Sequence, residues 1–232
     1  MRNYQYILLD LDDTLLDWHK TEEIGLRATM REVVGRELTP EEVRCYNVIN
    51  AGVWKRYEKK EVTKDELKRI RFLDFFKALG IPAEDELVDE VNRFYMQYQS
   101  HVVVEFPDAQ SLCRGLAAKY KLILITNGTD WVQRGRLSGT SFADVFTGVV
   151  ISDEVGCSKP DPAFFEGVKA ITGDSDVSRY LVVGDSLSSD IAFGRAIGAD
   201  TLWVHTRDDG QSGDATYTVR SLAEVGKLLL GD

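Results

Sequence analysis

The sequence predicts an α/β fold, in which a doubly wound and mostly parallel sheet is interrupted by an inserted all-helical domain. One observation is the apolar run from Tyr6, which ends abruptly in three carboxylates between Asp10 and Asp13, as a buried strand does at the edge of a sheet. Another is that no strand signal interrupts residues 17–99, whereas helices and short apolar strands alternate from Phe106 onward. The first strand and the second half of the chain are therefore expected to form one domain with right-handed connections.

The inserted region has the pattern of helices throughout. Apolar residues recur at helical spacing among charged ones, both at its beginning and at its end. Thr39 and Thr63 are each followed three residues later by a Glu, which is the capping-box pattern at a helix start, and Gly80 supplies a stop. The helices are expected over residues 22–34, 39–59, 67–79 and 84–99.

The second half of the chain alternates between amphipathic stretches and short apolar runs. Strands are expected at residues 121–126, 149–152, 180–184 and 201–205, and helices at 108–119, 131–137, 162–171 and 188–197. The domain boundaries follow from the two patterns. We expect a core domain of residues 1–16 and 101–232 and a helical domain of residues 17–100.

Composition narrows the class of partner. The chain has 232 residues and a formal net charge of −10, which would repel nucleic-acid polymers and anionic membrane surfaces but permits a small anionic substrate in a locally positive pocket. Cys45, Cys113 and Cys157 are widely spaced and suggest neither disulfides nor a cysteine metal site. The residues from Met1 to Gln5 contain no apolar signal segment, so a cytoplasmic location is expected. The oligomeric state stays open between monomer and dimer.

Acidic residues follow the first strand and the strand at 180–184. Asp10 and Asp12 come directly after the first apolar run, and Asp185 and Asp190 follow the later one. In a parallel sheet the carboxyl ends of the strands meet in the crevice where ligands bind. Close carboxylates stay ionised together only beside a cation, most economically a hard one that prefers oxygen ligands. The sequence therefore predicts a Mg²⁺ site at this edge.

Two further strand ends carry residues suited to a phosphate group. Thr126, Asn127 and Gly128 end one strand, offering a hydroxyl, a backbone N–H and a glycine that allows close approach. Lys159 places an ammonium just before the rigid Pro160 and a new helix. Each of these motifs alone is common in turns and helix caps. Their occurrence together, in order, makes a functional site the better interpretation.

The four motifs DLDDTL, ITNG, SKPDP and GDSLSSD, in this order, resemble those of the haloacid dehalogenase (HAD) superfamily, in particular its phosphatases with a helical cap inserted after the first motif. The resemblance implies a Rossmann-like core, a cap formed by the helical domain, and a two-step phosphoryl transfer. Asp10 would be the nucleophile that forms an aspartyl-phosphate. Asp12 would protonate the leaving alcohol and later activate the attacking water.

The resemblance also implies the remaining roles. Thr126, the Asn127 backbone and Gly128 would bind the phosphoryl group, and Lys159 would neutralise charge between it and the nucleophile. Mg²⁺ would be held by the Asp10 carboxylate, the Asp12 backbone carbonyl and Asp185. Asp190 would support the metal through water or through Lys159.

Other activities remain open at this stage. Dehalogenases of the superfamily do not keep the second aspartate of the first motif, so Asp12 favours a phosphatase. Aspartyl-phosphate chemistry by itself also allows a phosphomutase. A hypothesis of another class is a non-catalytic, receiver-like module with a regulatory Mg²⁺ site. Such a module would need neither the second aspartate nor a large cap.

A less specific resemblance concerns the substrate. The spacing around residues 133–137, Phe142, Phe146, residues 151–154 and Gly156 is similar to that of bacterial pyrimidine 5′-nucleotidases of the house-cleaning kind. It implies a nucleoside 5′-monophosphate as substrate, but phosphoglycolate and sugar-phosphate phosphatases share much of the pattern. Specificity would lie in the cap and near Trp18, whose ring follows the first motif.

Overall fold

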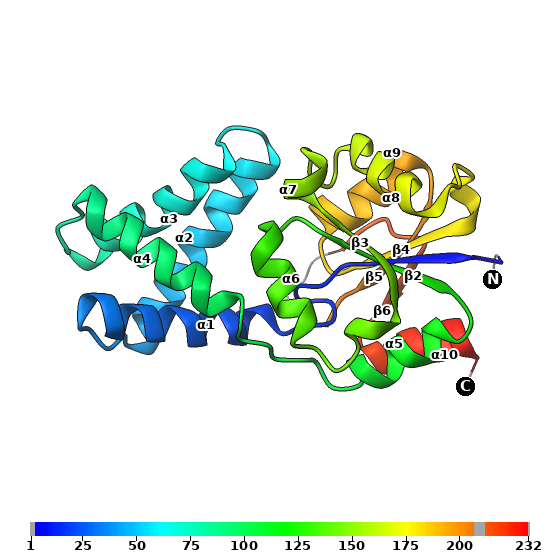
Figure 1. Ribbon diagram of the computed structural model, residues 1–232, viewed down its shortest axis with the longest axis horizontal. Helices are drawn as coiled ribbons and strands as arrows, with labels where there is room; N and C mark the ends of the chain where they lie inside the picture. Colours follow the sequence, from blue (N-terminus) through cyan, green and yellow to red (C-terminus); the bar gives the residue numbers. More distant parts are fainter. Residues whose placement is uncertain (1–2, 207–211, 232) are drawn as a thin grey trace. The chain divides into compact units, whose positions relative to one another are not determined.

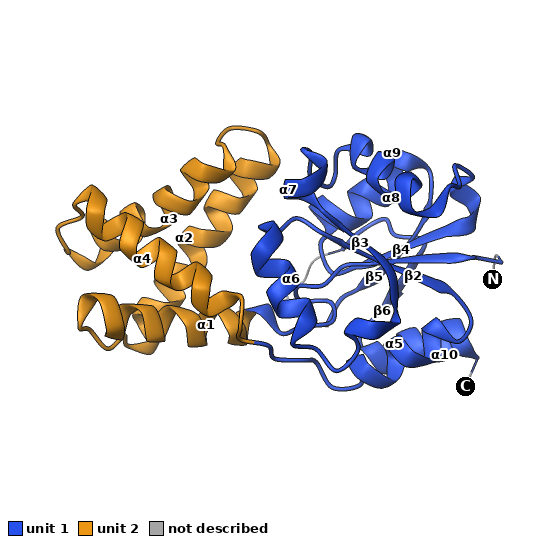
Figure 2. Ribbon diagram, in the orientation of Figure 1, with its two compact units in different colours: residues 1–18, 103–232 blue, residues 19–102 orange. Residues whose placement is uncertain are grey.

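The computed structural model describes residues 3–206 and 212–231, and their contacts divide the chain into two compact units (Figure 2). Unit 1 comprises Met1–Trp18 and Val103–Asp232, and unit 2 comprises His19–Val102. Residues 1–2, 207–211 and 232, which the sequence assigns to the core domain, lie outside the described residues. No helix among the described residues combines the length and the apolar character needed to cross a membrane.

Unit 1 contains a parallel sheet, which among the described residues has six strands in the order β3-β2-β1-β4-β5-β6. The strands are β1 (Tyr6–Leu9), β2 (Lys121–Thr126), β3 (Phe146–Ile151), β4 (Tyr180–Gly184), β5 (Asp200–Val204) and β6 (Tyr217–Val219). Leu8 pairs with Ile123 on one side and with Val182 on the other. The strand order reverses at β1 and β4, so their carboxyl ends form the topological switch point where ligands bind in open α/β sheets. The predicted α/β fold is confirmed.

Helices cover both faces of this sheet (Figure 1). Ile7 and Leu9 of β1 belong to one buried apolar cluster, and Tyr6 and Leu8 belong to the other, as the two-residue period of a doubly covered strand requires. The first cluster includes side chains of α5 and α10, and the second includes those of α8 and α9. The helices of unit 1 are α5 (Ala109–Ala117), α6 (Asp130–Ser138), α7 (Ser152–Val155), α8 (Phe165–Thr172), α9 (Ala192–Ile197) and α10 (Leu222–Leu230).

Some boundaries in unit 1 differ from the sequence expectation. β3 begins at Phe146, earlier than expected, because Thr147 and Gly148 interrupt the apolar run without ending the strand. The expected helix at 162–171 begins with a 3₁₀ turn, Pro162–Phe164, and the helix expected at 188–197 begins with a π-helical turn, Leu187–Ile191. Turns of this kind are frequent at the ends of α-helices. β6, α7 and α10 were not expected.

Residues 19–102, all of them described, form helices and no strand. The helices are α1 (Trp18–Thr29), which continues as a π-helical turn (Met30–Val34), α2 (Pro40–Glu58), α3 (Lys64–Leu79) and α4 (Asp85–Gln99). Both predicted capping boxes are confirmed, at Thr39 and at Thr63, and Gly80 ends α3 with a positive φ of 66°. α1 begins earlier than expected, since the Asp13 carboxylate accepts a hydrogen bond from the Trp18 backbone N–H at 3.2 Å.

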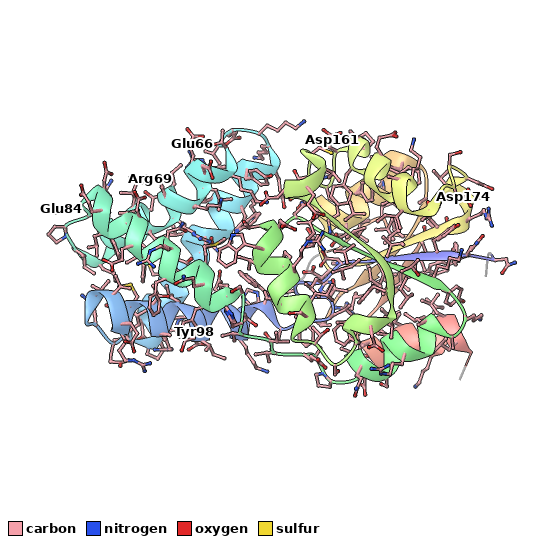
Figure 3. All side chains as sticks on the ribbon, viewed as in Figure 1. Glu66, Arg69, Glu84, Tyr98, Asp161 and Asp174 are labelled. Atoms are coloured by element: carbon pink, nitrogen blue, oxygen red, sulfur yellow. The ribbon has the colours of Figure 1, made fainter. Side chains whose placement is uncertain are left out.

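Unit 2 is held by a core of aromatic rings. Tyr46, Phe72, Phe75 and Tyr95 are fully buried, and the ring of Tyr46 lies 5.2 Å from that of Phe75 in an edge-on arrangement. At its surface, charged residues link neighbouring helices. Arg69 of α3 pairs with Asp85 and Asp89 of α4, and Figure 3 shows it among the outer side chains of this unit. The core of this unit is therefore mainly aromatic, with a few buried polar side chains such as Glu22 and Arg71, and these ion pairs lie at its surface.

Candidate active site

Asp10 lies at the carboxyl end of β1, between the ends of β2 and β4. Its backbone N–H donates to the Val183 carbonyl at 2.9 Å, which continues the ladder of the sheet one residue past the strand. Its side chain is only 8% exposed. One carboxylate oxygen accepts from the Lys159 ammonium at 2.7 Å, and the other accepts from the Thr14 hydroxyl at 3.2 Å. The sheet thus fixes a buried carboxylate whose two oxygens are both oriented.

Lys159 is fully buried and uses all three of its ammonium donors. Nζ donates to Asp10 at 2.7 Å, to Asp190 at 2.6 Å and to the Ile125 carbonyl at 3.0 Å. Burial alone would favour the neutral amine, but the Asp10 and Asp190 carboxylates outweigh it and raise the pKa of Lys159 above its usual value. The side chain is therefore a fixed positive charge between two carboxylates.

Asn127 holds the backbone that carries this lysine. Its amide Nδ2 donates to the Lys159 carbonyl at 2.8 Å, and its Oδ1 accepts from the Lys159 N–H at 2.9 Å. Nδ2 also donates to the Ser189 hydroxyl at 3.3 Å. The sequence suggested a role for the backbone N–H of Asn127. Its side chain has a second role, which is to hold the Lys159 backbone. Sequence spacing could not reveal this role, because Asn127 and Lys159 are far apart in the chain.

Three carboxylates meet beside Lys159. Oxygen atoms of Asp10, Asp185 and Asp190 lie within 4.8 Å of one another. Gly184 permits this, because a Cβ at this position would collide with the Asp190 carboxylate. Burial, and next the charge of Asp190, raise the pKa of Asp10 to about 7, with Lys159 acting in the opposite direction.

This cluster suits a divalent cation. Three carboxylates face one ammonium, so a hard cation with a charge of two would balance the site, and oxygen donors are those that Mg²⁺ prefers. The Asp12 carboxylate is not part of the cluster. The expected contribution of the Asp12 backbone carbonyl to the metal stays a prediction.

Asp12 is instead bound by two side chains of α6. Its Oδ1 pairs with Nη1 of Arg136, and its Oδ2 accepts from Nε2 of Gln133 at 2.8 Å. Nε2 of Gln133 also donates to the Thr126 hydroxyl oxygen at 2.6 Å. The sequence placed Gln133 and Arg136 in a stretch whose spacing resembles pyrimidine 5′-nucleotidases, but it gave neither side chain a role in the site. A further signal was their spacing of three residues, which places them on the same face of a helix.

Gly128 and Trp18 both pack against this α6 pair. A Cβ at position 128 would collide with the Gln133 side chain, so the glycine is required for packing within the site as well as for any approach of a ligand. The Trp18 ring faces the Arg136 guanidinium, 4.8 Å from ring centre to guanidinium carbon. A role for Trp18 in specificity stays a prediction.

The candidate residues from the four motifs thus converge, although they come from distant parts of the chain. Asp10, Lys159, Asp185 and Asp190 form one cluster, and Asn127 supports it through the Lys159 backbone. Asp12 and Thr126 are joined to each other through Gln133. A nucleophilic carboxylate, a second carboxylate two residues later, a fixed ammonium and a hydroxyl are the groups that phosphoryl transfer requires.

Comparison with known proteins identifies the family of this chain. The model of the haloacid dehalogenase-like hydrolase family matches residues 4–198. The chain is 30% identical to the pyrimidine 5′-nucleotidase PynA of Streptococcus pneumoniae, over 96% of this chain and 93% of that protein. It is also 30% identical to the pyrimidine 5′-nucleotidase YjjG of Escherichia coli, over 97% and 98% of the two chains. A crystal structure of the HAD-hydrolase YfnB from Bacillus subtilis, bound to magnesium, matches with a TM-score of 0.88 at 28% identity, over 98% of this chain and 99% of that one.

Proposed function

Because the chain belongs to the haloacid dehalogenase-like hydrolases and is a phosphoric monoester hydrolase, we propose that it hydrolyses a nucleoside 5′-monophosphate, most readily a pyrimidine one, through an aspartyl-phosphate on Asp10. The observation that carries the mechanism is the position of Asp10, held by Lys159 at the switch point of the sheet, with Asp12 two residues later. The observation that supports the substrate is the near full-length similarity to two pyrimidine 5′-nucleotidases.

In the first step the Asp10 carboxylate attacks phosphorus and the bond from phosphorus to the leaving alcohol breaks. Asp12 gives that alcohol its proton, because an alkoxide is a poor leaving group. In the second step Asp12 takes a proton from water, and the water oxygen attacks the phosphoryl group on Asp10. Inorganic phosphate leaves and the Asp10 carboxylate is restored. Atoms and protons balance over the two steps, so the only reactants needed are the ester and water.

Fixed groups stabilise the transferred group. The Thr126 hydroxyl and the Asn127 backbone N–H would donate to the phosphoryl oxygens, and Gln133 already orients the Thr126 hydroxyl. The Lys159 ammonium, whose three protons go to Asp10, Asp190 and the Ile125 carbonyl, would act through its charge. Asp10, Asp185 and Asp190, with the Asp12 carbonyl, would hold Mg²⁺. When bound, the metal supplies positive charge that offsets the carboxylates and polarises the phosphoryl group.

The proposal leaves defined alternatives. Phosphoglycolate or a sugar phosphate could be turned over by the same Asp10 and Asp12, and a mutase would differ only in passing the phosphoryl group to another hydroxyl instead of water. A receiver-like module would show no turnover at all. The substrate is in each enzymatic case a small phosphorylated metabolite, and exclusion of nucleic-acid polymers and membranes, like a cytoplasmic location, stays a prediction from the sequence.

A panel of phosphorylated metabolites tests the proposal. With Mg²⁺, the purified protein should release phosphate from pyrimidine nucleoside monophosphates with a higher kcat/KM than from phosphoglycolate, hexose phosphates or glycerol phosphate. Chelation should abolish release, and Ca²⁺ should inhibit it because this larger ion prefers more ligands. Full activity in excess chelator would contradict the metal assignment. Higher efficiency on phosphoglycolate or a hexose phosphate would overturn the nucleotide assignment alone.

Trp18 provides a sharper test of the substrate class. If its ring contacts the base, Trp18→Ala should lower kcat/KM for a nucleoside monophosphate by roughly 10-fold more than for glycerol phosphate. Both substrates release an alkyl alcohol, so the comparison is insensitive to any effect of Trp18 on proton transfer through Arg136. Equal losses on the two substrates would assign Trp18 to packing of Arg136 and remove it from specificity.

A further inference from the structure

We propose that Arg136 and Gln133 of α6 are positioning residues for Asp12, and that Gln133 in addition orients the Thr126 hydroxyl toward the phosphoryl group. The inference rests on the proposed phosphatase function for the reaction that it describes. It concerns two side chains that the four sequence motifs do not contain.

The two oxygens of Asp12 are bound by different donors. Arg136 contacts Oδ1 through Nη1, and Gln133 contacts Oδ2 through Nε2 at 2.8 Å. Both donors come from one face of α6, and Nη1 of Arg136 also donates to Oε1 of Gln133 at 3.2 Å. A carboxylate bound at both oxygens from one rigid element cannot rotate freely. Since a carboxylate can accept about four hydrogen bonds, positions remain for the proton that Asp12 must carry.

Gln133 is buried, and its amide group is used completely. One Nε2 proton goes to Asp12, the other to the Thr126 hydroxyl oxygen at 2.6 Å, and Oε1 accepts from Arg136. Because Gln133 can only donate through Nε2, the Thr126 hydroxyl must accept this bond, and its own proton remains available. Among the described residues this proton has no acceptor, so it can be donated to a phosphoryl oxygen.

The surroundings of Arg136 indicate that its contact with Asp12 serves function and not stability. Its side chain is 0% exposed, and among the described residues its Nε and Nη2 have no hydrogen-bond partner. Its ionic partner is Asp12, and the Trp18 ring covers the guanidinium at 4.8 Å. Burying a guanidinium with part of its hydrogen-bonding capacity unused costs stability, which a well-packed apolar residue would avoid. What the arginine provides is a fixed charge beside the Asp12 carboxylate.

The Arg136 charge lies beside Asp12, the group whose position controls proton transfer. Asp12 must first reach the oxygen of the leaving alcohol and later a water molecule, and its side chain is 29% exposed, which leaves it accessible to both. A small displacement of such a group reduces proton transfer steeply. A leaving group that needs no proton, such as nitrophenolate, does not depend on this step. Variants of the positioning residues should therefore discriminate between the two kinds of leaving group.

The test measures single-turnover release of alcohol from an alkyl phosphate and of nitrophenolate from nitrophenyl phosphate, in Mg²⁺. Arg136→Met should slow alcohol release by about 30-fold and nitrophenolate release by roughly 3-fold or less. In the Asp12→Asn background the same substitution should slow alcohol release by less than about 2-fold, because the group that it positions is already lost. Arg134→Met is the matched control, since Arg134 lies on the same helix, is half exposed and pairs with Asp130 at 2.7 Å. It should leave both rates unchanged.

Equal losses on the two substrates, or an undiminished loss in the Asp12→Asn background, would overturn the inference and assign Arg136 to packing. If Arg136→Met does not fold, as circular dichroism would show, Gln133→Met takes its place. The rate of alcohol release in that variant should fall more than the rate of nitrophenolate release. Both rates should fall in part, because the Thr126 hydroxyl is no longer oriented. Equal falls in the two rates would overturn the inference. Failure of the proposed function is distinguishable, because the unsubstituted protein would then hydrolyse neither ester.

Discussion

The two units bury charged side chains in different ways. In unit 1, Asp10 and Asp190 share one ammonium, that of Lys159, at the end of the sheet. In unit 2, the buried Glu22 accepts from the Asn50 amide at 2.5 Å, and the buried Arg71 donates to the Asn92 amide oxygen at 2.7 Å and lies over the Tyr95 ring. Unit 2 thus surrounds single buried charges with amides and rings, although Nε of Arg71 has no hydrogen-bond partner among the described residues, whereas unit 1 places like charges together, where they repel each other. We therefore expect the chemistry to reside in unit 1, because clustered like charges cost stability and are typical of functional sites.

The strongest test of this contrast is loss of the nucleophile. Asp10→Asn keeps the size of the side chain but removes the attacking carboxylate, so kcat should fall by at least about 1,000-fold on every substrate. The measurement is phosphate release with Mg²⁺, and thermal unfolding verifies the fold. Glu22→Gln, the same change at the buried carboxylate of unit 2, should keep far more activity than Asp10→Asn. Comparable losses in the two variants would contradict the contrast.

Unit 2 should instead respond through stability. Phe72 is fully buried among aromatic rings, and Phe72→Ala should lower the free energy of unfolding by about 3–5 kcal/mol because it leaves a cavity in the core. Urea unfolding provides the measurement. Val48→Ala is the control, since Val48 is 75% exposed and its truncation should change the stability by less than about 0.5 kcal/mol. A cost below about 1 kcal/mol for Phe72→Ala would indicate a loosely packed unit.

A smaller effect is expected at the helix starts of unit 2. The Thr39 and Thr63 hydroxyls accept from the backbone N–H groups of Glu42 and Glu66, both at 3.2 Å. Thr39→Ala and Thr63→Ala should each cost about 1 kcal/mol in urea unfolding, and Thr→Ser at the same positions should cost little. Equal costs for Ala and Ser would show that the methyl group, not the cap, stabilises these positions.

The same caps predict the smallest effect, a dependence on pH. Hydrogen bonds from the Thr39 and Thr63 backbones lower the pKa of Glu42 and Glu66 below the ordinary value of 4.5. The stabilisation from these carboxylates is present above that value and is lost as the pH falls through the lowered pKa. The destabilisation caused by Glu42→Gln or Glu66→Gln should therefore be present at about pH 6 and shrink progressively once the pH falls below the ordinary pKa of 4.5. A difference that grows on acidification would contradict the sign.

The sequence predicted the parts of the molecule that local patterns determine. β2 and β4 have the expected bounds, and both capping boxes form, because continuous apolar runs and cap residues are local features of the sequence. β6, with three residues at the sheet edge, is too short for a pattern. The start of α10 had a signal, since Ser221 lies three residues before Glu224 and accepts from its N–H at 3.2 Å.

The candidate site divides in the same way. The sequence motifs indicated the chemistry of four site residues by their residue types, namely Asp10, Asp12, Lys159 and Asp185. Gln133 and Arg136 gave no such indication, because a Gln and an Arg on an amphipathic helix resemble ordinary surface residues until the fold turns them toward Asp12. The side-chain role of Asn127 depends on a partner brought by a distant segment. Contacts between side chains from distant segments depend on the tertiary structure, and a single sequence does not predict them.

The most direct measurement of the central claim is detection of the covalent phosphoryl group on Asp10. An Asp12→Asn variant should accumulate the aspartyl-phosphate, because it retains the nucleophile and lacks the base that activates water. After mixing with nitrophenyl phosphate and Mg²⁺, rapid quenching and reduction with borohydride, mass spectrometry of the peptide containing residues 6–16 should show Asp10 converted to homoserine. Unmodified Asp10 despite nitrophenolate release, or the modification at another aspartate, would contradict the account.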